Sequence, residues 1–272
     1  MIAVSVGNPE VSMPLVRDYP ESAVVIAGGT SGVGLATALA FADAGVRRIA
    51  LLARNVERGK LARERVLDRH PAAEVVFIPT DAEDFEQVNA SVAEAHRALA
   101  GIDVLVNSTT ATYRPELLHR TPQADVEGIL TRQALPPMHM TRAVLPLMRE
   151  QGGGSIVNIA SDAAKVATPG EAVLGAAMAA IVMFSRVAAI EAKRDGVRVN
   201  VVTPSLISGT PTADNVLRDG FSKKLFEKAA SQAHLGVAEP ADLASLIVFL
   251  GGPGSAKLTG QAISVNGGIS AA

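Results

Sequence analysis

Short apolar runs alternate with longer helical patterns along nearly the whole chain, and this alternation constrains the fold more than any other feature. Seven runs rich in Val and Ile are candidate strands, at 23–27, 48–53, 74–78, 102–107, 155–159, 197–203 and 262–265. Most are apolar at consecutive positions, as strands buried on both faces are. Helical patterns lie between them, at 33–44, 56–69, 83–99, 125–150, 171–194, 213–232 and 240–250. The order predicts an α/β fold of three layers, with a doubly wound, seven-stranded parallel sheet in the middle.

No repeat or linker divides the 272 residues, so we predict one domain over 21–272, preceded by a loosely held N-terminal extension over 1–20. Lys and Arg number 25 and Asp and Glu 27, which gives a net charge of −2. This balance favours neither nucleic acid nor an anionic membrane as a partner. The uncharged apolar stretch 172–184 is shorter than the roughly 20 apolar residues of a membrane span.

The chain contains no cysteine, and its five histidines are scattered. Disulfides, thiolate nucleophiles and cysteine metal sites are therefore excluded, and we expect no metal. An intracellular, cytoplasmic protein fits this composition.

A glycine-rich turn follows the first candidate strand directly and opens a helix. Gly28 permits a sharp turn, Gly32 lets backbone amides approach a pyrophosphate, and Gly34 lets helix and strand pack closely. Because a strand precedes it and a helix follows it, the turn predicts a dinucleotide site in a Rossmann fold rather than an ordinary connection. The residues expected at the phosphates are Gly28, Thr30, Ser31, Gly32, Val33 and Gly34.

The end of the second candidate strand indicates which dinucleotide binds. An acidic side chain there would bind the ribose hydroxyls of NAD, but the position holds Ala53, followed by Arg54 and Asn55. A guanidinium group can bind the additional phosphate of NADP through two hydrogen bonds. We therefore favour NADP(H) over NAD(H); the alternative is that Arg54 is an ordinary solvated arginine.

The spacing Gly28-x-x-x-Gly32-x-Gly34 resembles that of the short-chain dehydrogenase/reductase family. The resemblance extends from residue 22 to the end, through Asp81-Ala82, 145–148 with 152–159, 196–201, and 258–261 with 266–268. It implies that Asp81 and Ala82 lie at the adenine. It further implies a homodimer or homotetramer joined by the helix near 171–194, and it adds to the cofactor site the residues Asn107, Pro204, Ile207 and Thr210.

The same resemblance shows a departure where the catalytic residues belong. The family uses a serine, a tyrosine that protonates the carbonyl oxygen, a lysine four residues later and an upstream asparagine. Ser161 matches the serine, but the tyrosine position holds Leu174, the lysine position Met178 and the asparagine position Gln133. Leucine and methionine cannot donate a proton, so ordinary ketone or alcohol chemistry is not expected.

Reduction of a carbon–carbon double bond conjugated to a thioester is compatible with these losses. Charge then collects on the thioester oxygen, so the site needs an oxyanion donor more than an acid at oxygen. Ser161 is the candidate donor, Tyr113 and Gln133 are candidate assistants, and Leu174, Met178 and Asp162 are candidate pocket residues. The substrate would be a thioester of coenzyme A or a carrier protein, and the chain resembles atypical family members such as the cyclohexenylcarbonyl-coenzyme A reductases.

Other interpretations stay open at this point. Ser161 is equally suited to capping the next segment, and Tyr113 to anchoring a loop. Lys165 follows Ser161 closely and Glu171 lies near the pocket in the family pattern, but charged loop residues usually face solvent. The alternatives to a reductase are a non-redox enzyme on the same fold (a cyclase, isomerase or dehydratase) and an inactive partner subunit.

Two adjacent prolines interrupt the helical pattern over 125–150. Pro136 and Pro137 lack backbone donors and oppose a helix upstream of them. The pair predicts that the helix starts, or kinks sharply, at Pro137.

Overall fold

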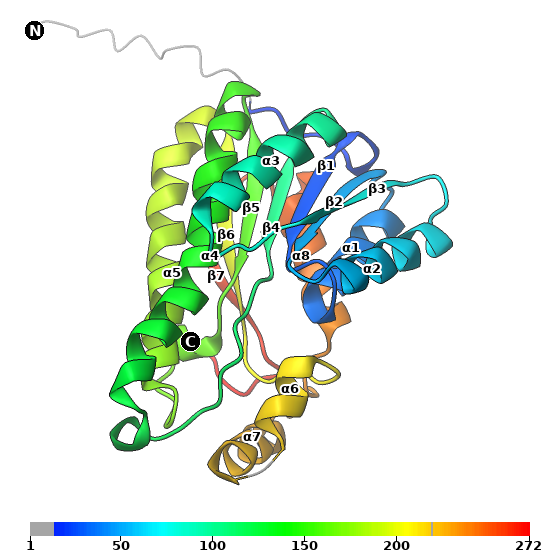
Figure 1. The fold of residues 1–272 in the computed structure, drawn as a ribbon. Helices are drawn as coiled ribbons and strands as arrows, with labels where there is room; N and C mark the ends of the chain where they lie inside the picture. Colours follow the sequence, from blue (N-terminus) through cyan, green and yellow to red (C-terminus); the bar gives the residue numbers. More distant parts are fainter. Residues whose placement is uncertain (1–13, 219) are drawn as a thin grey trace, which may run out of the picture.

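A seven-stranded parallel sheet in the order β3-β2-β1-β4-β5-β6-β7 forms the middle of the molecule (Figure 1). The structure is a computed structural model and describes residues 14–218 and 220–272. The strands are β1 (Ala23–Ala27), β2 (Arg48–Ala53), β3 (Glu74–Pro79), β4 (Val104–Asn107), β5 (Gly154–Ile159), β6 (Val197–Pro204) and β7 (Ala262–Val265). The predicted fold class is confirmed, because every expected strand is present and all pairings are parallel.

Helices cover both faces of the sheet. One layer contains α1 (Gly32–Asp43), α2 (Val56–Arg69) and α8 (Pro240–Gly251), and the other contains α3 (Phe85–Leu99), α4 (Gln123–Glu150) and α5 (Ala172–Ala192). Two shorter helices, α6 (Pro211–Val216) and α7 (Gly220–Gln232), lie beyond the carboxyl ends of the strands (Figure 1). Short 3-10 turns lie at η1 (Tyr19–Glu21), η2 (Leu118–Arg120), η3 (Asp162–Ala164), η4 (Lys193–Asp195) and η5 (Pro253–Ser255).

The central strand shows why the chain forms two cores. All five residues of β1 are buried, and successive side chains of a strand point to opposite faces. Ala23, Val25 and Ala27 pack with α3, α4 and α5, whereas Val24 and Ile26 pack with α1, α2 and α8. The strand order reverses between β1 and β4, which places a ligand crevice at their carboxyl ends.

The prediction that the helix near the two prolines starts at Pro137 is wrong. α4 runs without interruption from Gln123 to Glu150 and contains Pro136, Pro137 and Pro146. An interior proline costs about 3 kcal/mol because it removes one helical hydrogen bond and crowds the preceding turn. The long packing of α4 against α3 and α5 offsets this cost, and both Pro136 and Pro137 are buried.

Two other expectations need correction. The helical pattern over 213–232 forms two helices, α6 and α7, instead of one. Residues 14–20 are not loosely held: the Leu15 amide donates to the Gly152 carbonyl at 3.0 Å, and the Arg17 guanidinium binds Asp103 at 2.9 Å. The Tyr19 hydroxyl donates to the Val248 carbonyl at 3.1 Å. Residues 1–13 of the expected extension lie outside the described residues.

One helical segment in the described part of the chain, Ala172–Asp195, has the length and apolar composition of a membrane span. Core helices of soluble proteins pass the same test, and α5 packs along α4 and β6, with its inward residues in two of the core clusters.

Candidate functional site

The glycine turn between β1 and α1 is packed so closely that side chains are excluded. A Cβ atom on Gly28, whose φ is +78°, would lie 2.3 Å from the Ser108 carbonyl oxygen. A Cβ atom on Gly34 would lie 2.1 Å from the Gly28 carbonyl oxygen. Helix α1 begins at Gly32, with Ser31 as its N-cap, so the free amides of its first turn are available to an anion.

A cleft opens beside this turn at the carboxyl ends of β1 to β4. Its floor and walls come from four strand ends and from α4, and residues from the sequence prediction make up much of its lining. The lining residues are Ala27, Gly28, Thr30, Ser31, Leu52, Ala53, Arg54, Asn55, Arg58, Thr80, Asp81, Ala82, Glu83, Ser108, Thr109, Thr110, Ala111, Arg132, Pro136 and Met140. The cleft thus joins a helix N-terminus to polar strand ends, which fits a dinucleotide.

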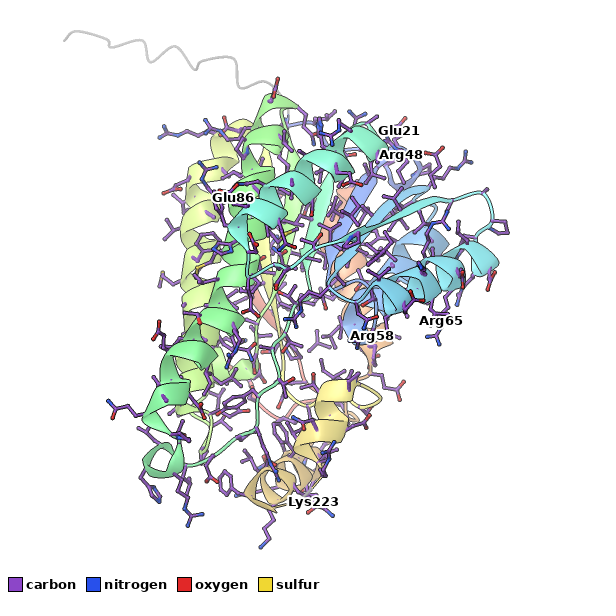
Figure 2. All side chains as sticks on the ribbon, in the orientation of Figure 1. Glu21, Arg48, Arg58, Arg65, Glu86 and Lys223 are labelled. Carbon is purple, nitrogen blue, oxygen red and sulfur yellow. The ribbon has the colours of Figure 1, made fainter. Side chains whose placement is uncertain are left out.

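Two arginines line the part of the cleft beyond β2. Arg54 lies 3.7 Å from the Glu83 carboxylate, and most of its side chain is exposed. Arg58, at the start of α2 (Figure 2), lines the same cleft and was not singled out from the sequence. Asn55 caps α2 by accepting a hydrogen bond from the Arg58 amide at 2.9 Å. Two guanidinium groups therefore lie at the end of β2, and one of them, that of Arg54, also pairs with Glu83.

The segment after β6 returns to the glycine turn. A Cβ atom on Gly32 would lie 3.6 Å from the Thr210 methyl group, so Thr210 is a neighbour of the turn. The Thr210 hydroxyl also caps α6, accepting from the Ala213 amide at 3.1 Å. Ile207 packs in the core cluster that contains Val33, and Pro204 ends β6 opposite Val265. The structure therefore brings Thr210, Ile207 and Val33 together.

Gln133 and Asn107, two of the predicted site residues, bind other parts of the protein instead of lining the cleft. The Gln133 amide donates to the Ala111 carbonyl at 3.0 Å and accepts from the Ala111 amide at 3.4 Å, which fastens the loop after β4 to α4. The Asn107 amide is 1% exposed and donates to Asn158 Oδ1 at 2.7 Å. Both side chains therefore support the cleft from behind.

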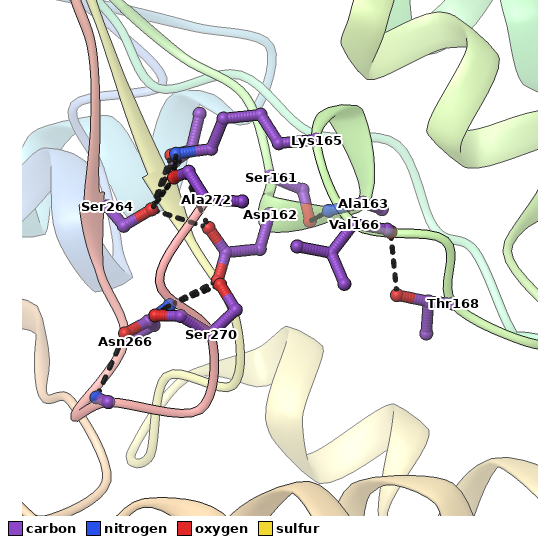
Figure 3. A network of polar contacts seen from close by, with 12 residues as sticks. Ser161, Asp162, Ala163, Lys165, Val166, Thr168, Ser264, Asn266, Ser270 and Ala272 are labelled. Atoms are coloured by element: carbon purple, nitrogen blue, oxygen red, sulfur yellow. Dashed lines mark hydrogen bonds and ion pairs between the residues drawn. The ribbon is translucent and has the colours of Figure 1, made fainter.

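Ser161 and Asp162 form the turn after β5. The Ser161 hydroxyl accepts a hydrogen bond from the Ala163 amide at 3.2 Å, so it caps η3. The Asp162 carboxylate is buried and points to the chain's last segment (Figure 3), where it accepts from Ser264 Oγ at 2.9 Å and Ser270 Oγ at 2.8 Å, and from the Asn266 amide. Asp162 therefore joins η3 to the C-terminal segment. The sequence predicted it as a substrate-pocket residue and did not predict these contacts.

Leu174 and Met178 lie in one apolar cluster on α5. They are 9% and 6% exposed, and they pack with Ala160, next to Ser161, and with Tyr113 from the loop after β4. The cluster thus brings together three of the residues predicted from the sequence. The two positions that the sequence resemblance matches to the family's tyrosine and lysine are therefore apolar.

The Tyr113 hydroxyl already forms a hydrogen bond within the protein. It donates to the Gly170 carbonyl at 2.6 Å, and the side-chain amide of Asn215 on α6 donates to the Tyr113 carbonyl at 3.3 Å. Burial, with the nearby Glu171 and Glu116 carboxylates, raises the pKa of Tyr113 to about 12. A phenol with this pKa is a poor acid at neutral pH, so its position favours an anchoring role.

The sequence places Glu171 either near the pocket, as in the family pattern, or on a solvated face, and the second alternative is wrong. The side chain is 8% exposed, and burial raises the pKa of its carboxyl group to about 7. A lone glutamate beside a proline-glycine pair carries no local signal of burial. The preceding residue, Gly170, lies against Phe221 of α7 and Pro115 of the loop after β4, which are distant in sequence.

Comparison with known proteins defines the class. The sequence model described as "Enoyl-(Acyl carrier protein) reductase" matches residues 27–270. This match and the fold place the chain in the short-chain dehydrogenase/reductase family. The protein is therefore an oxidoreductase by family.

Among individual relatives, the 3-oxoacyl-[acyl-carrier-protein] reductase FabG of Thermotoga maritima is 30% identical over 90% of this chain and 96% of its own length. The 2-(R)-hydroxypropyl-CoM dehydrogenase of Xanthobacter autotrophicus is 31% identical over 91% and 98%. A short chain oxidoreductase of Pseudomonas aeruginosa, described as containing an atypical catalytic center, is 28% identical over 94% of this chain and all of its own, with a TM-score of 0.85. Its NADPH-bound structure is 29% identical over 94% of this chain and 99% of its own, with a TM-score of 0.81.

Proposed function

We propose that this protein is an NADP(H)-dependent reductase that acts on the conjugated carbon–carbon double bond of an enoyl thioester. The observation that carries the proposal is the pair of buried apolar side chains, Leu174 and Met178, in a chain whose cleft fits a dinucleotide. A ketone substrate would lose roughly 10²–10⁴ in rate without an acid at its oxygen. An enoyl thioester needs hydrogen bonding to a developing oxyanion instead.

The residues of the cleft fit NADPH, which supplies a hydride when bound. The glycine turn and the first amides of α1 would hold the pyrophosphate, and Asp81 and Ala82 the adenine. Arg54 and Arg58 would hold the additional phosphate. The NADPH-bound relative from Pseudomonas aeruginosa, with its atypical catalytic center, supports this assignment.

Ser161, Leu174 and Met178 would act on the substrate directly. Ser161 would donate its hydroxyl proton in a hydrogen bond to the thioester oxygen while accepting from the Ala163 amide. Leu174 and Met178 would exclude water from an alkenyl or cyclohexenyl group. Tyr113 and Gln133 would fix the loop after β4 through Gly170 and Ala111. The thioester would carry coenzyme A or a carrier protein, consistent with the FabG relatives.

The test is incubation of the protein with NADPH and a panel of enoyl thioesters, with matched ketones as controls. We expect NADPH oxidation with an enoyl thioester and none with the ketones. Oxidation with ketones alone would contradict the proposal. Product formed without a change in nicotinamide absorbance would indicate a non-redox enzyme, and turnover only with a co-purified relative would indicate a partner subunit.

A double variant tests the role of the hydrocarbon. L174Y with M178K introduces the family's two polar groups on α5. We expect it to gain weak ketone reduction without any gain with the enoyl thioester. A strong increase with the enoyl thioester would show that the two apolar residues are not adapted to it.

We also propose a cytoplasmic homodimer or homotetramer. Met183, Val187 and Ile190 are spaced along one side of α5 and are 57%, 48% and 62% exposed. An exposed apolar stripe of this kind marks an interface. Light scattering on the purified protein should give a dimer or larger, and M183E with I190E should give a monomer.

A further inference from the structure

Glu171 places a buried carboxyl group at the N-terminus of α5, where it is the N-cap residue and Leu174 is the third residue of the helix. Its carboxyl group is also an electrostatic neighbour of Tyr113, which packs in the apolar cluster with Leu174 and Met178. Glu171 directly precedes the helix and Leu174 lies one turn later. The carboxyl group therefore lies one turn before the position of the family's missing acid. Within residues 14–218 and 220–272 its oxygens form no hydrogen bond, so they remain available to a ligand.

We propose that Glu171 is the acid that protonates the α-carbon of the reduced substrate. The inference rests on the proposed enoyl thioester reduction, because only that reaction leaves a carbon to be protonated. The Tyr113 hydroxyl donates its hydrogen bond to the Gly170 carbonyl at 2.6 Å and is not available for this step. Ser161 is used at the thioester oxygen.

The reduction has two parts, hydride addition at the β-carbon and proton transfer to the α-carbon. Hydride addition at the β-carbon forms a C–H bond, moves the π electrons onto the thioester oxygen and oxidises the nicotinamide by two electrons. As the thioester carbonyl re-forms, the α-carbon takes the proton of the Glu171 carboxyl group, and the O–H bond breaks to leave a carboxylate. Water then returns a proton to Glu171. The sum consumes one enoyl thioester, one NADPH and one proton.

The surroundings of Glu171 favour the protonated form at neutral pH. Burial is the cause of its raised pKa, and no cation lowers it. Asp162 and Lys165 bind the C-terminal segment, and Lys223 pairs with Glu227. The titratable and charged groups on the elements around Glu171 include Tyr113, Arg114 and Glu116 after β4, Asp162 and Lys165 after β5, and Lys223, Lys224, Glu227 and Lys228 on α7. An acid with a pKa near 7 is well matched to proton donation at physiological pH.

The experiment compares the wild type with E171Q, which keeps the shape of the side chain and removes the acid. We expect kcat with an enoyl thioester to fall about a hundredfold, within the range of general acid catalysis. The wild-type rate should fall tenfold per pH unit above about pH 7, and the E171Q rate should not depend on pH there. NADPH affinity, measured by fluorescence, should stay within about twofold of the wild type, because Glu171 is not in the cleft lining.

A matched control is E116Q, which removes the other carboxyl group near Tyr113 and should keep the rate and the pH profile. Titration of ¹³C-labelled glutamates by NMR, without substrate, should give one carboxyl near pH 7 that E171Q removes. An E171Q protein with the wild-type rate and pH profile would overturn this inference alone. Failure of the wild type to reduce any enoyl thioester would overturn the proposed function, and the inference with it.

Discussion

The two ends of the site differ in what they require of the sequence. At the glycine turn, function depends on backbone amides and on the absence of side chains, and the Gly28 and Gly34 positions leave no room for a Cβ atom. At the end formed by β5 and α5, the proposed function depends on the identity of side chains, because Leu174 and Met178 are the α5 residues that we match to the family's tyrosine and lysine. The proposed cofactor site therefore depends on backbone geometry, whereas the proposed chemistry beside it depends on which side chains are present.

The largest expected effect comes from filling the glycine turn. G28A would place a Cβ atom 2.3 Å from the Ser108 carbonyl oxygen at a φ of +78°, so the turn and the β4 loop must separate. We expect NADPH affinity to fall about a thousandfold, or about 4 kcal/mol, by fluorescence titration. G152A is the control, because Gly152 has a φ of +82° with nothing within 4 Å of its Cβ position. G152A should lose stability but keep the wild-type affinity for NADPH. Equal losses of affinity in both variants would show that the Cβ overlap with Ser108 is not the cause.

The second-largest expected effect is a pH dependence of stability caused by Glu171, at the β5–α5 end. Folded Glu171 keeps its proton up to about pH 7, whereas the unfolded chain loses it near the ordinary glutamate pKa. Unfolding between these values releases a proton, so stability falls as pH rises and levels off above pH 7. The fall is at most about 3 kcal/mol. Urea unfolding at pH 5 and pH 8 should show it in the wild type and in E116Q, and E171Q should lack it; an unchanged slope in E171Q would assign it to other groups.

The same contrast explains what the sequence predicts well. All seven strands lie within two residues of their predicted bounds, because alternation and glycine turns are local signals. The partners of Asp162 lie more than 100 residues away, at Ser264, Asn266 and Ser270, and no local pattern announces them. The burial of Glu171 and the continuity of α4 through Pro136 and Pro137 also result from tertiary packing. Side-chain roles at the β5–α5 end were therefore the least predictable part.

The third prediction concerns the Asp162 contacts in Figure 3. D162N replaces an acceptor oxygen by an amide donor that faces the donors of Ser270 and Asn266. We expect a loss of about 2 kcal/mol of stability, typical of a buried polar group left unsatisfied. Urea denaturation should show the loss in D162N and none in D68N, an exposed aspartate on α2. If D162N is as stable as the wild type, the contacts of η3 with the C-terminal segment do not hold this end together.

The smallest effect is expected at the cofactor end, where we propose that the Arg54 side chain binds the additional phosphate of NADPH. The Arg54 side chain is mostly exposed and forms an ion pair with Glu83 at 3.7 Å. Because solvent and Glu83 both weaken its attraction for a phosphate, R54A should weaken NADPH binding by only about tenfold. NADH has no additional phosphate, and its affinity should not change. R47A removes an exposed arginine at the opposite end of β2 and should affect neither nucleotide. Equal weakening of NADPH and NADH in R54A would mean that Arg54 supports the cleft without reading the phosphate, and Arg58 would then be the remaining candidate for that contact.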